Sequence, residues 1–554
     1  MVNSIFNGNR EKTSGSTNKA KGTMPLKLFI TTLTSALLAV MAAGGPALAQ
    51  KAGGILKLSH LDSPASMSIL EESTSATLQP MMGVFNNLVM YDQHIAQSSL
   101  ETIVPDLATS WSWSEDGTEL TFPLRTGVKW HDGKPFTAAD VKCTWDLLMG
   151  RGSHKLRLNP RKSWYDNVAE VVTRGDFEVS FKLKRPKPYL LTLIASGWSP
   201  IYPCHVPARE MRQHPIGTGP FKFVSFKHNE KIKVSKNPNY WKPGRPYLDG
   251  IEYTIMREAG TRNLAFFAGK FDMIPLNVSI PTLKDFKAQA PRAICEVQTG
   301  NLPRTLLVNP TAPPFDNPEL RRAMGLAFDR QAFLEILNQG KGAIGANMMP
   351  PPDGDWGMPP EVLQTLPGYG PDVEKNRAEA RKIMEKLGYG PDKRLAIKLS
   401  TRNFPNWRNP AVIMISHLKE IYIDAELDLV DTARWYGKMA RKDYTVGAVP
   451  IESGVDDPDQ MFFENYLCGA VRNYGGYCNP ELDKLINQQS MEANPVKRKD
   501  IVWQIERILA EAEVRPVLFY PAIASCWEPW VKDLTLMTNS IYNGWRMEDV
   551  WLDK

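Results

Sequence analysis

Strand patterns and helix patterns alternate along almost the whole chain of 554 residues. Apolar residues recur at every second position in 120–124, 177–183 and 395–399. Such a period of two, with polar residues between, is typical of strands that bury one face. Mixed strands and helices over this length predict an α/β protein with more than one sheet.

Clear N-terminal signals mark the predicted helices. The tetrapeptide Asn-Pro-Glu-Leu occurs at 317–320 and again at 479–482, and Asn494-Pro495 repeats its first two residues. Asn caps the free N–H groups of a first turn, and Pro fits the first helical position because its missing N–H has no partner there anyway. Asp372 opens another helical run, and the run from Asn317 predicts one helical region that ends near Gly340.

The N-terminus carries an export signal. Lys27 precedes the apolar stretch 28–43, and Ala47-Leu48-Ala49 follows a Gly-Gly-Pro turn. A basic start, an apolar middle and an A-x-A end describe a secretory signal peptide, with cleavage near Ala49. A membrane anchor is the alternative, but the stretch is shorter than the roughly 20 residues that a span needs. The translation start is either Met1 or Met24. After cleavage of the signal peptide, the mature protein is expected to be soluble and periplasmic.

Charge argues against a nucleic-acid binder. The first 49 residues carry a net charge of +4, so the remaining 505 residues carry only +2 of the total of +6. Dedicated nucleic-acid binders concentrate a much larger positive charge. We therefore expect no nucleic-acid partner.

Six cysteines remain after the signal peptide, and an exported protein can oxidise them. Only Cys468 and Cys478 lie close together, in a glycine-containing segment that permits a tight loop, so we predict a disulfide between them. The pairing of the other four stays open. Neither these cysteines nor the eight histidines show the clustered spacing of metal ligands, so no metal and no cofactor are predicted.

Enzyme motifs are also missing from the sequence. It contains no G-x-S-x-G, H-E-x-x-H or G-x₄-G-K-[ST] pattern. One G-x-G-x-x-G, at 340–345, follows a helical run and leads into Pro350-Pro351-Pro352, which cannot start the helix that a dinucleotide site requires. We interpret it as a loop and predict that the protein is not an enzyme.

Four long stretches, in this order, resemble a single family. They are LATSWSWSEDGTELTFPLRTGVKWHDGKPFTAADV at 107–141, PIGTGPFKFVSFKHNEKIKVSKNPNYW at 215–241, FDNPELRRAMGLAFDRQAFLEIL at 315–337 and DDPDQMFFENYLCGAVRNYGGYCNPELDKLI at 456–486. They are similar to the bacterial extracellular solute-binding proteins of family 5, which are the dipeptide-, oligopeptide- and nickel-binding components of ABC importers. The resemblance covers nearly all of 54–554.

This resemblance implies the two-lobed periplasmic-binding-protein fold, in its type II, large three-domain form, with mixed sheets and a hinge. Mapped onto this chain, the parts are the signal peptide at 1–49, lobe one at 50–86 and 205–300 with an inserted subdomain at 87–204, lobe two at 301–519, and a C-terminal segment of lobe one at 520–554. The hinge would use the segments near 299–308 and 515–521. Such proteins close their two lobes around a ligand.

The resemblance also implies the partners. We expect a peptide or peptide-like ligand, held between the lobes, and the permease subunits of an ABC transporter in the inner membrane. The protein itself is expected to be a monomer.

In peptide-binding relatives, an Asp a few residues before the Asp-Pro pair binds the α-amino group of the ligand. Counted back from Asp457-Pro458, that position is Gly454 here. A buried ammonium needs a paired anion. Either Glu452 or Asp456 supplies that anion from a shifted register, or the protein does not bind a free peptide N-terminus.

A ligand carboxylate in such relatives can meet an Arg in the loop after a lobe-two strand. Here Arg402 and Arg408 both follow the strand pattern 395–399, and an Arg guanidinium binds a carboxylate through two parallel hydrogen bonds. Trp407 and Trp435 are expected to stack on the ligand or to pack in the core. Trp198 is the candidate from lobe one.

Two other functions stay open at this point. The same importer role is compatible with a non-peptide solute, such as a nickel chelate, haem, an opine or an oligosaccharide, because the family includes such ligands. A secreted hydrolase is the more remote alternative.

Overall fold

A 12-stranded sheet runs through the structure, which is a computed structural model that describes residues 50–152, 154–451 and 453–554. The predicted signal peptide at 1–49 therefore lies outside the described residues. Within the described part, no helix is both long and apolar enough to cross a membrane. Residues 51–554 group into one unit by their contacts, and the following description concerns this unit.

The large sheet mixes parallel and antiparallel strands. Strand β1 pairs in parallel with β10 and β11, and β15 pairs in parallel with β16 and β17, whereas the other neighbours are antiparallel. This confirms the predicted α/β class with mixed sheets. In order across the sheet, the strands are β16 (Ile423–Val430), β15 (Leu395–Arg402), β17 (Val446–Pro450), β13 (Arg304–Val308), β18 (Val517–Trp527), β11 (Met273–Val278), β1 (Ile55–His60), β10 (Gly250–Ile255), β9 (Lys231–Lys236) and β8 (Phe221–Lys227).

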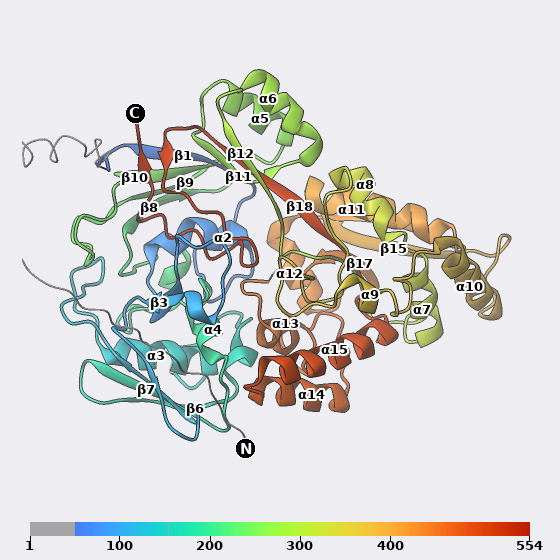
Figure 1. Ribbon diagram of the computed structural model, residues 1–554, viewed down its shortest axis with the longest axis horizontal. Helices are drawn as coiled ribbons and strands as arrows, with labels where there is room; N and C mark the ends of the chain where they lie inside the picture. The colour runs from blue at the N-terminus through green and yellow to red at the C-terminus, as the bar shows by residue number, and fades with distance from the viewer. Residues whose placement is uncertain (1–49, 153, 452) are drawn as a thin grey trace, which may run out of the picture. The chain divides into compact units, whose positions relative to one another are not determined.

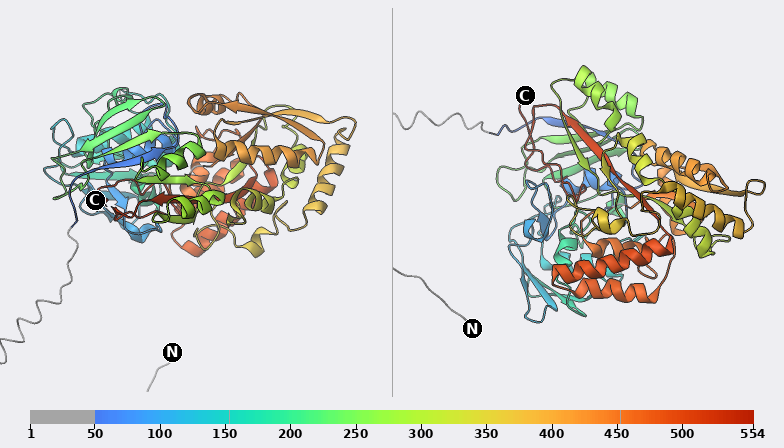
Figure 2. Two further views of the ribbon diagram at one scale, coloured as in Figure 1. Left: turned by 90° about the horizontal axis from the view of Figure 1, so that it is seen from above. Right: turned by 45° about the vertical axis from the view of Figure 1, so that its right-hand side comes forward.

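Strand β18 joins the two halves of this sheet. Its N-terminal part pairs with β13, and its C-terminal part, from Ala522 to Trp527, pairs with β12 (Ile294–Thr299). The short strand β14 (Gly342–Ala343) pairs with its middle, at Tyr520 and Pro521. All of its residues are buried. In Figures 1 and 2 this long red strand runs from the β11 and β12 side to the β13 and β17 side.

Smaller sheets complete the strand content. A four-stranded antiparallel sheet orders β4 (Ser112–Trp113), β5 (Glu119–Pro123), β7 (Glu178–Leu183) and β6 (Val168–Thr173), and α3 (Ala138–Met149) packs on it. Two-stranded sheets pair β2 (Val89–Tyr91) with β3 (Ile103–Pro105) and β19 (Val531–Lys532) with β20 (Trp551–Leu552).

The buried apolar residues form separate clusters on the two sides of β18. The cluster that we call the first core draws on residues 56–273 and 523–552, with Val455, and the second core draws on 306–519. Helix α11 (Pro405–Lys419) covers β15 and β16, and α14 (Pro480–Met491) packs against α15 (Pro495–Ala512). The remaining α-helices are α2 (Ser75–Met81), α4 (Leu190–Ala195), α5 (Ala259–Phe267), α6 (Leu283–Gln289), α7 (Pro318–Leu326), α8 (Arg330–Asn338), α9 (Pro360–Leu363), α10 (Val373–Lys386), α12 (Thr432–Ala440) and α13 (Pro458–Asn465).

The predicted helix starts are observed as capped N-termini. The side chain of Asn317 accepts a hydrogen bond from the backbone N–H of Glu319, and Asn479, Asn494 and Asp372 cap α14, α15 and α10 in the same manner. The single helical region expected from Asn317 to Gly340 is divided, however. Asp329 leaves the helical conformation and its carboxylate caps Ala332, so that α7 ends and α8 begins in a new direction.

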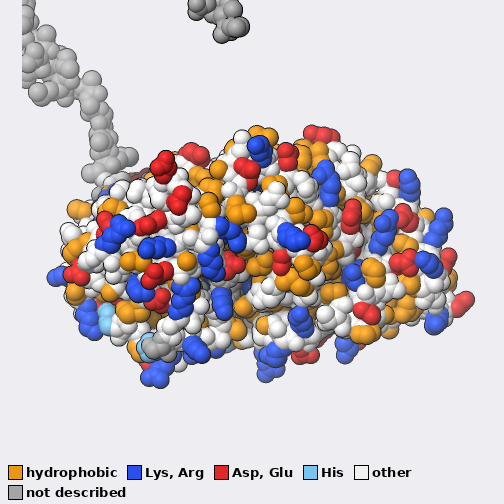
Figure 3. Space-filling model, turned by 90° about the horizontal axis from the view of Figure 1, so that it is seen from below, with side chains coloured by type: hydrophobic (Ala, Val, Ile, Leu, Met, Phe, Trp, Pro, Cys, Tyr) orange, Lys and Arg blue, Asp and Glu red, His pale blue; other side chains and the backbone are white. Residues whose placement is uncertain are grey.

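The surface mixes charges of both signs. On the face shown in Figure 3, Lys and Arg side chains alternate with Asp and Glu side chains, and apolar side chains lie between them. This agrees with the small net charge that the sequence assigns to the chain after residue 49.

Three disulfides stabilise the described chain. Cys468 and Cys478 are bonded as predicted. The four cysteines whose pairing stayed open form Cys143–Cys204 and Cys295–Cys526. The latter connects β12 to β18, so it closes a loop of 231 residues beside the strand that joins the sheet halves.

We predict that these bonds stabilise the protein unequally. The entropy of the unfolded chain falls more when a longer loop is closed, which gives about 5 kcal/mol for Cys295–Cys526 and about 3 kcal/mol for the ten-residue Cys468–Cys478 loop. Replacing both cysteines of each pair by alanine should therefore lower the urea midpoint of unfolding more for Cys295 and Cys526. An equal or larger loss on removing Cys468–Cys478 would contradict this expectation.

Candidate ligand-binding cleft

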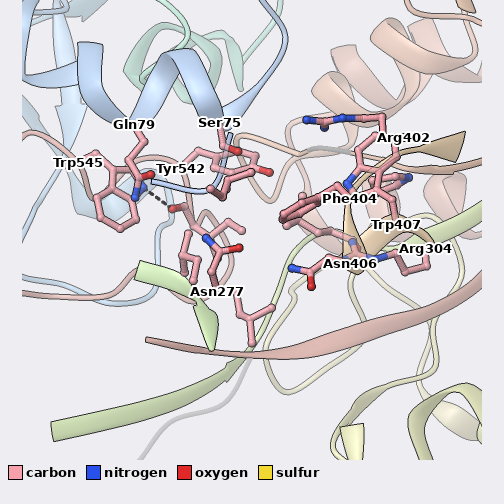
Figure 4. Close-up of a pocket in the computed structure, with 16 residues that line it drawn as sticks. Ser75, Gln79, Asn277, Arg304, Arg402, Phe404, Asn406, Trp407, Tyr542 and Trp545 are labelled. Atoms are coloured by element: carbon pink, nitrogen blue, oxygen red, sulfur yellow. Dashed lines mark hydrogen bonds between the residues drawn. The ribbon is translucent and has the colours of Figure 1, made fainter. Parts of the chain in front are cut away.

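A cleft lies between the first and second cores, at the carboxyl ends of β1 and β15. The first-core side contributes side chains from α2, β11 and the C-terminal segment, and the second-core side contributes side chains from β13, β15 and the start of α11 (Figure 4). The residues labelled there on the two sides are Ser75, Gln79, Asn277, Tyr542 and Trp545 on the first, and Arg304, Arg402, Phe404, Asn406 and Trp407 on the second. Ligands of open α/β sheets bind at such strand ends.

The cleft is narrow in this structure. Its cavity has a volume of about 60 Å³, and an adjoining cavity of about 110 Å³ shares Asn277, Arg304 and Asn406 with it. On this measure one water molecule needs about 10–15 Å³. The two cavities therefore have room for several water molecules but not for a peptide.

An ion pair across the cleft holds its two sides together. Arg402, the last residue of β15, places Nη2 2.9 Å from Oδ2 of Asp62, which follows β1. Both residues are buried, with 3% and 2% of their surface exposed. Arg402 also donates from Nε to the hydroxyl of Thr432 at 3.0 Å, and that hydroxyl donates to Asp62.

Asp62 is held as an anion by its surroundings. Burial raises its pKa, but Arg402, the Thr432 hydroxyl and Arg257, whose Nε lies 2.8 Å from Oδ1, together bring the pKa below its ordinary value. The guanidinium that the sequence assigned to a ligand carboxylate thus has a carboxylate of the chain itself as its partner here. The predicted contact of Arg402 with a ligand carboxylate stays a prediction.

The aromatic candidates differ in their positions. Trp407 lines the cleft and lies under the Arg402 guanidinium, 4.5 Å from the ring centroid. Trp435 is fully buried behind it, with the two rings edge to face at 5.7 Å, so its contacts are those of a core residue. Trp198 is also buried and does not line the cleft, but its ring meets that of the cleft residue Tyr542 edge to face, with 6.4 Å between ring centroids.

The charged candidates are also dispersed. Arg408, in the first turns of α11, is half-buried and lines neither the cleft nor its adjoining cavity. Asp456 lies at a different cavity, described below. Glu452 lies outside the described residues. Of the six predicted substrate-binding residues that the structure describes, two line the cleft, Arg402 and Trp407.

Gly454, at the position of the expected Asp, has no room for a side chain. A Cβ built on it would lie 2.6 Å from Cδ1 and 2.9 Å from Nε1 of Trp198. Its carbonyl accepts a hydrogen bond of 2.7 Å from Asn543, and its N–H donates to Gln460. Trp198 therefore fills the space next to this glycine.

Several cleft residues were missed by the sequence analysis. Asn277, Arg304 and Asn406 carry polar groups into both cavities, and Tyr542 and Trp545 come from the far C-terminus. Asp62 follows β1 and thus lies, like Arg402, at the carboxyl end of a parallel strand, where ligands of such sheets bind. Arg402 was predicted from the family resemblance, which gave no expectation for Asp62.

Comparison with known proteins gives the same fold. The model of the family "Bacterial extracellular solute-binding proteins, family 5 Middle" matches residues 102–473. Di/tripeptide-binding protein 1 of Pseudomonas aeruginosa (strain UCBPP-PA14) is 26% identical over 454 residues, which are 77% of this chain and 81% of that protein.

Solved structures resemble the whole described unit. The periplasmic binding protein DppA from Helicobacter pylori, in complex with the peptide STSA, superposes with a TM-score of 0.78 at 20% identity, over 91% of this chain and 99% of that one. The binding protein AgaA from A. tumefaciens R10, in complex with agropinic acid, gives 0.77 at 23% identity, over 90% and 99%. With its type II periplasmic-binding-protein fold and its family match over most of its length, the chain belongs to the bacterial extracellular solute-binding proteins of family 5.

Proposed function

We propose that this chain is the solute-binding component of an ABC importer, and that it holds a peptide or peptide-like solute in the cleft between its two cores. The observation that carries the proposal is the convergence of polar side chains from both sheet halves on one cavity, closed by the Arg402–Asp62 pair. Its relatives include a di/tripeptide-binding protein, which supports a peptide as the ligand class.

The cellular setting follows from the same proposal. The signal peptide directs export, cleavage near Ala49 releases a monomer to the periplasm, and the permease subunits in the inner membrane accept the solute. The protein binds the solute and does not convert it chemically. The family match and a relative that binds di- and tripeptides support this part.

The proposed motion is a hinge closure between the predicted lobes. The chain crosses between the sheet halves at 300–303, between β12 and β13, and again within β18 near Tyr520. These crossings fall inside the predicted hinge segments 299–308 and 515–521. Opening would separate Asp62 from Arg402 and expose both to water, and a bound solute would shift the population toward the closed form.

The cleft favours a solute with an anionic group. Arg304 and Arg402 line it, and no Asp or Glu side chain does so among the described residues; Asp62, which pairs with Arg402 here, would give up that partner when the cleft opens. Gly454 provides no carboxylate, and Trp198 fills the space beside it. A solute that carries a carboxylate but no free α-ammonium fits this charge better than an ordinary dipeptide. This observation keeps the non-peptide solute as the second candidate, with the same importer role.

Native mass spectrometry of the mature protein, purified from its own periplasm without refolding, tests the ligand class. A ladder of small peptide masses after ligand release is the result expected for a peptide carrier. A single non-peptide mass would replace the peptide by the second candidate. A protein that exports correctly, retains nothing and gains no thermal stability from any member of a peptide and organic-acid panel would contradict the solute-binding function.

Arg402 is expected to contribute to solute binding, and Arg408 provides a matched control. Arg402→Ala removes both the positive charge of the cleft and the contact with Asp62, so it should weaken binding of the retained solute by at least about 1 kcal/mol, as expected for a charged hydrogen bond. Arg408→Ala, on the same segment but away from the cavity, should leave the dissociation constant unchanged. Equal effects of the two changes in calorimetric titrations would show that the cleft has been assigned wrongly.

Gly454 and Trp198 are expected to be coupled. Gly454→Asp forces a side chain against Trp198 and should destabilise the protein by about 2 kcal/mol, in the range found for overpacked cores. Adding Trp198→Ala removes the obstacle, so the double variant should be more stable than the sum of the single changes predicts. Thermal unfolding of the four proteins gives the coupling energy, and strict additivity would refute the steric explanation.

A further inference from the structure

A second, larger cavity lies apart from the cleft. Its volume is about 610 Å³, and it shares no lining residue with the cleft or the adjoining cavity. Its walls come from both sides of the molecule, from the segments 91–101 and 189–192 on one side and from 355–356, 456–457 and the start of α15 on the other. This volume falls within the range of small-molecule sites.

Four aromatic rings wall this cavity, and neighbours fix them in place. The rings of Tyr189 and Trp356 meet edge to face at 5.7 Å. Trp503 donates from Nε1 to the carbonyl of Trp356 at 3.0 Å, and Trp356 donates to the carbonyl of Asp456 at 3.1 Å. The hydroxyl of Tyr91 donates to the carbonyl of Thr192 at 3.1 Å. The walls are therefore preformed rather than assembled by a ligand.

The charge of this cavity is negative. Carboxylates of five residues line it against a single lysine, Lys499; they are Glu101, Asp355, Asp456, Asp457 and Asp500. Asp457 is neutralised from behind, because Arg498 makes two hydrogen bonds of 2.9 and 3.0 Å with it. Among the described residues, no Lys, Arg or His makes an ion pair with the other four.

The negative charge of Asp456 has no positive charge beside it among the described residues, only neutral hydrogen-bond donors. Its Oδ2 accepts from the backbone N–H of Asp355 at 2.9 Å and from Asn539 at 3.5 Å, and both donors are neutral. Burial, with smaller contributions from Asp355 and Asp457, raises its pKa to about 7. A positive charge placed beside Asp456 would relieve this repulsion.

The residues around this cavity are not those of a metal site. In the part of the chain that the structure describes, no group of three or more His, Cys, Asp or Glu side chains has an arrangement that could hold a metal ion. The guanidinium of Arg498 already lies over the rings of Tyr189 and Trp356, 3.7 and 4.5 Å from their centroids. An aromatic ring next to carboxylates suits an organic cation, which gains from the ring as well as from the charge, and Trp503 is the tryptophan of this wall that Arg498 does not cover.

We propose that this cavity is a second binding site, which takes the ammonium or guanidinium group of a small organic cation between the aromatic walls and Asp456. Because its walls come from both sides of the molecule, an occupant favours the closed arrangement. The proposal does not depend on which solute the cleft binds.

Cadaverine and agmatine, titrated calorimetrically into the mature protein, test this site, with 1-pentanol as an uncharged probe. We expect both cations to bind and pentanol not to bind. Asp456→Asn keeps the size of the side chain and an acceptor oxygen but removes the charge, so it should weaken cadaverine binding at least tenfold at pH 8. Asp355→Asn, which leaves the backbone donor in place, should weaken it about threefold.

Two controls keep the result specific. Asp392→Asn removes an exposed carboxylate in the loop before β15 and should leave cadaverine binding unchanged. Arg408→Ala changes a residue that lines neither this cavity nor the cleft, and should also leave it unchanged. Thermal unfolding checks that each variant is folded. Absence of cation binding in the unchanged protein, or a loss in Asp392→Asn or Arg408→Ala equal to that in Asp456→Asn, would overturn the proposal, and none of these results bears on solute binding in the cleft.

Discussion

Strand β18 is the constraint on which the arrangement of the molecule depends. It is buried over its whole length and pairs with strands of both sheet halves, so the first and second cores share one continuous backbone element. The Cys295–Cys526 bond fixes its C-terminal end to β12. A strand held in this way stays paired on both sides, so the hinge closure that we propose would turn about the crossing points near it.

The Arg402–Asp62 pair is suited to such a rotation. Burying two charges costs desolvation energy, and the attraction between them offsets about that cost. A buried ion pair therefore adds little net stability to the closed form. In the proposed opening of the cleft, water would replace each partner of the pair. The closed and open forms can then lie close in free energy, and a solute with modest differential affinity for the closed form is enough to shift the balance.

Local sequence signals predicted where helices and strands begin better than they predicted which residues lie side by side in space. The Asn-Pro starts of α7, α14 and α15 are observed because capping involves only adjacent residues. The break between α7 and α8 was missed. The apolar residues keep helical spacing on both sides of it, and the only local sign of a new helix start is the capping residue Asp329. The cleft was predicted only in part: Arg402 follows a visible strand, whereas Tyr542 reaches Trp198 and the cleft through a C-terminal segment without periodic pattern.

The sequence between β17 and α13 distributes charge between the two cavities. Position 454 faces Trp198 on the side of the cleft, and position 456 faces the second cavity. With Gly at the first and Asp at the second, the carboxylate of this segment lies at the second cavity and not beside Trp198. In the cleft, the carboxylate partner of Arg402 is Asp62, from the opposite side, while among the described residues Asp456 has no cation as a partner. The position of one charge within this segment thus decides which chemical group each cavity can accept, within one and the same fold.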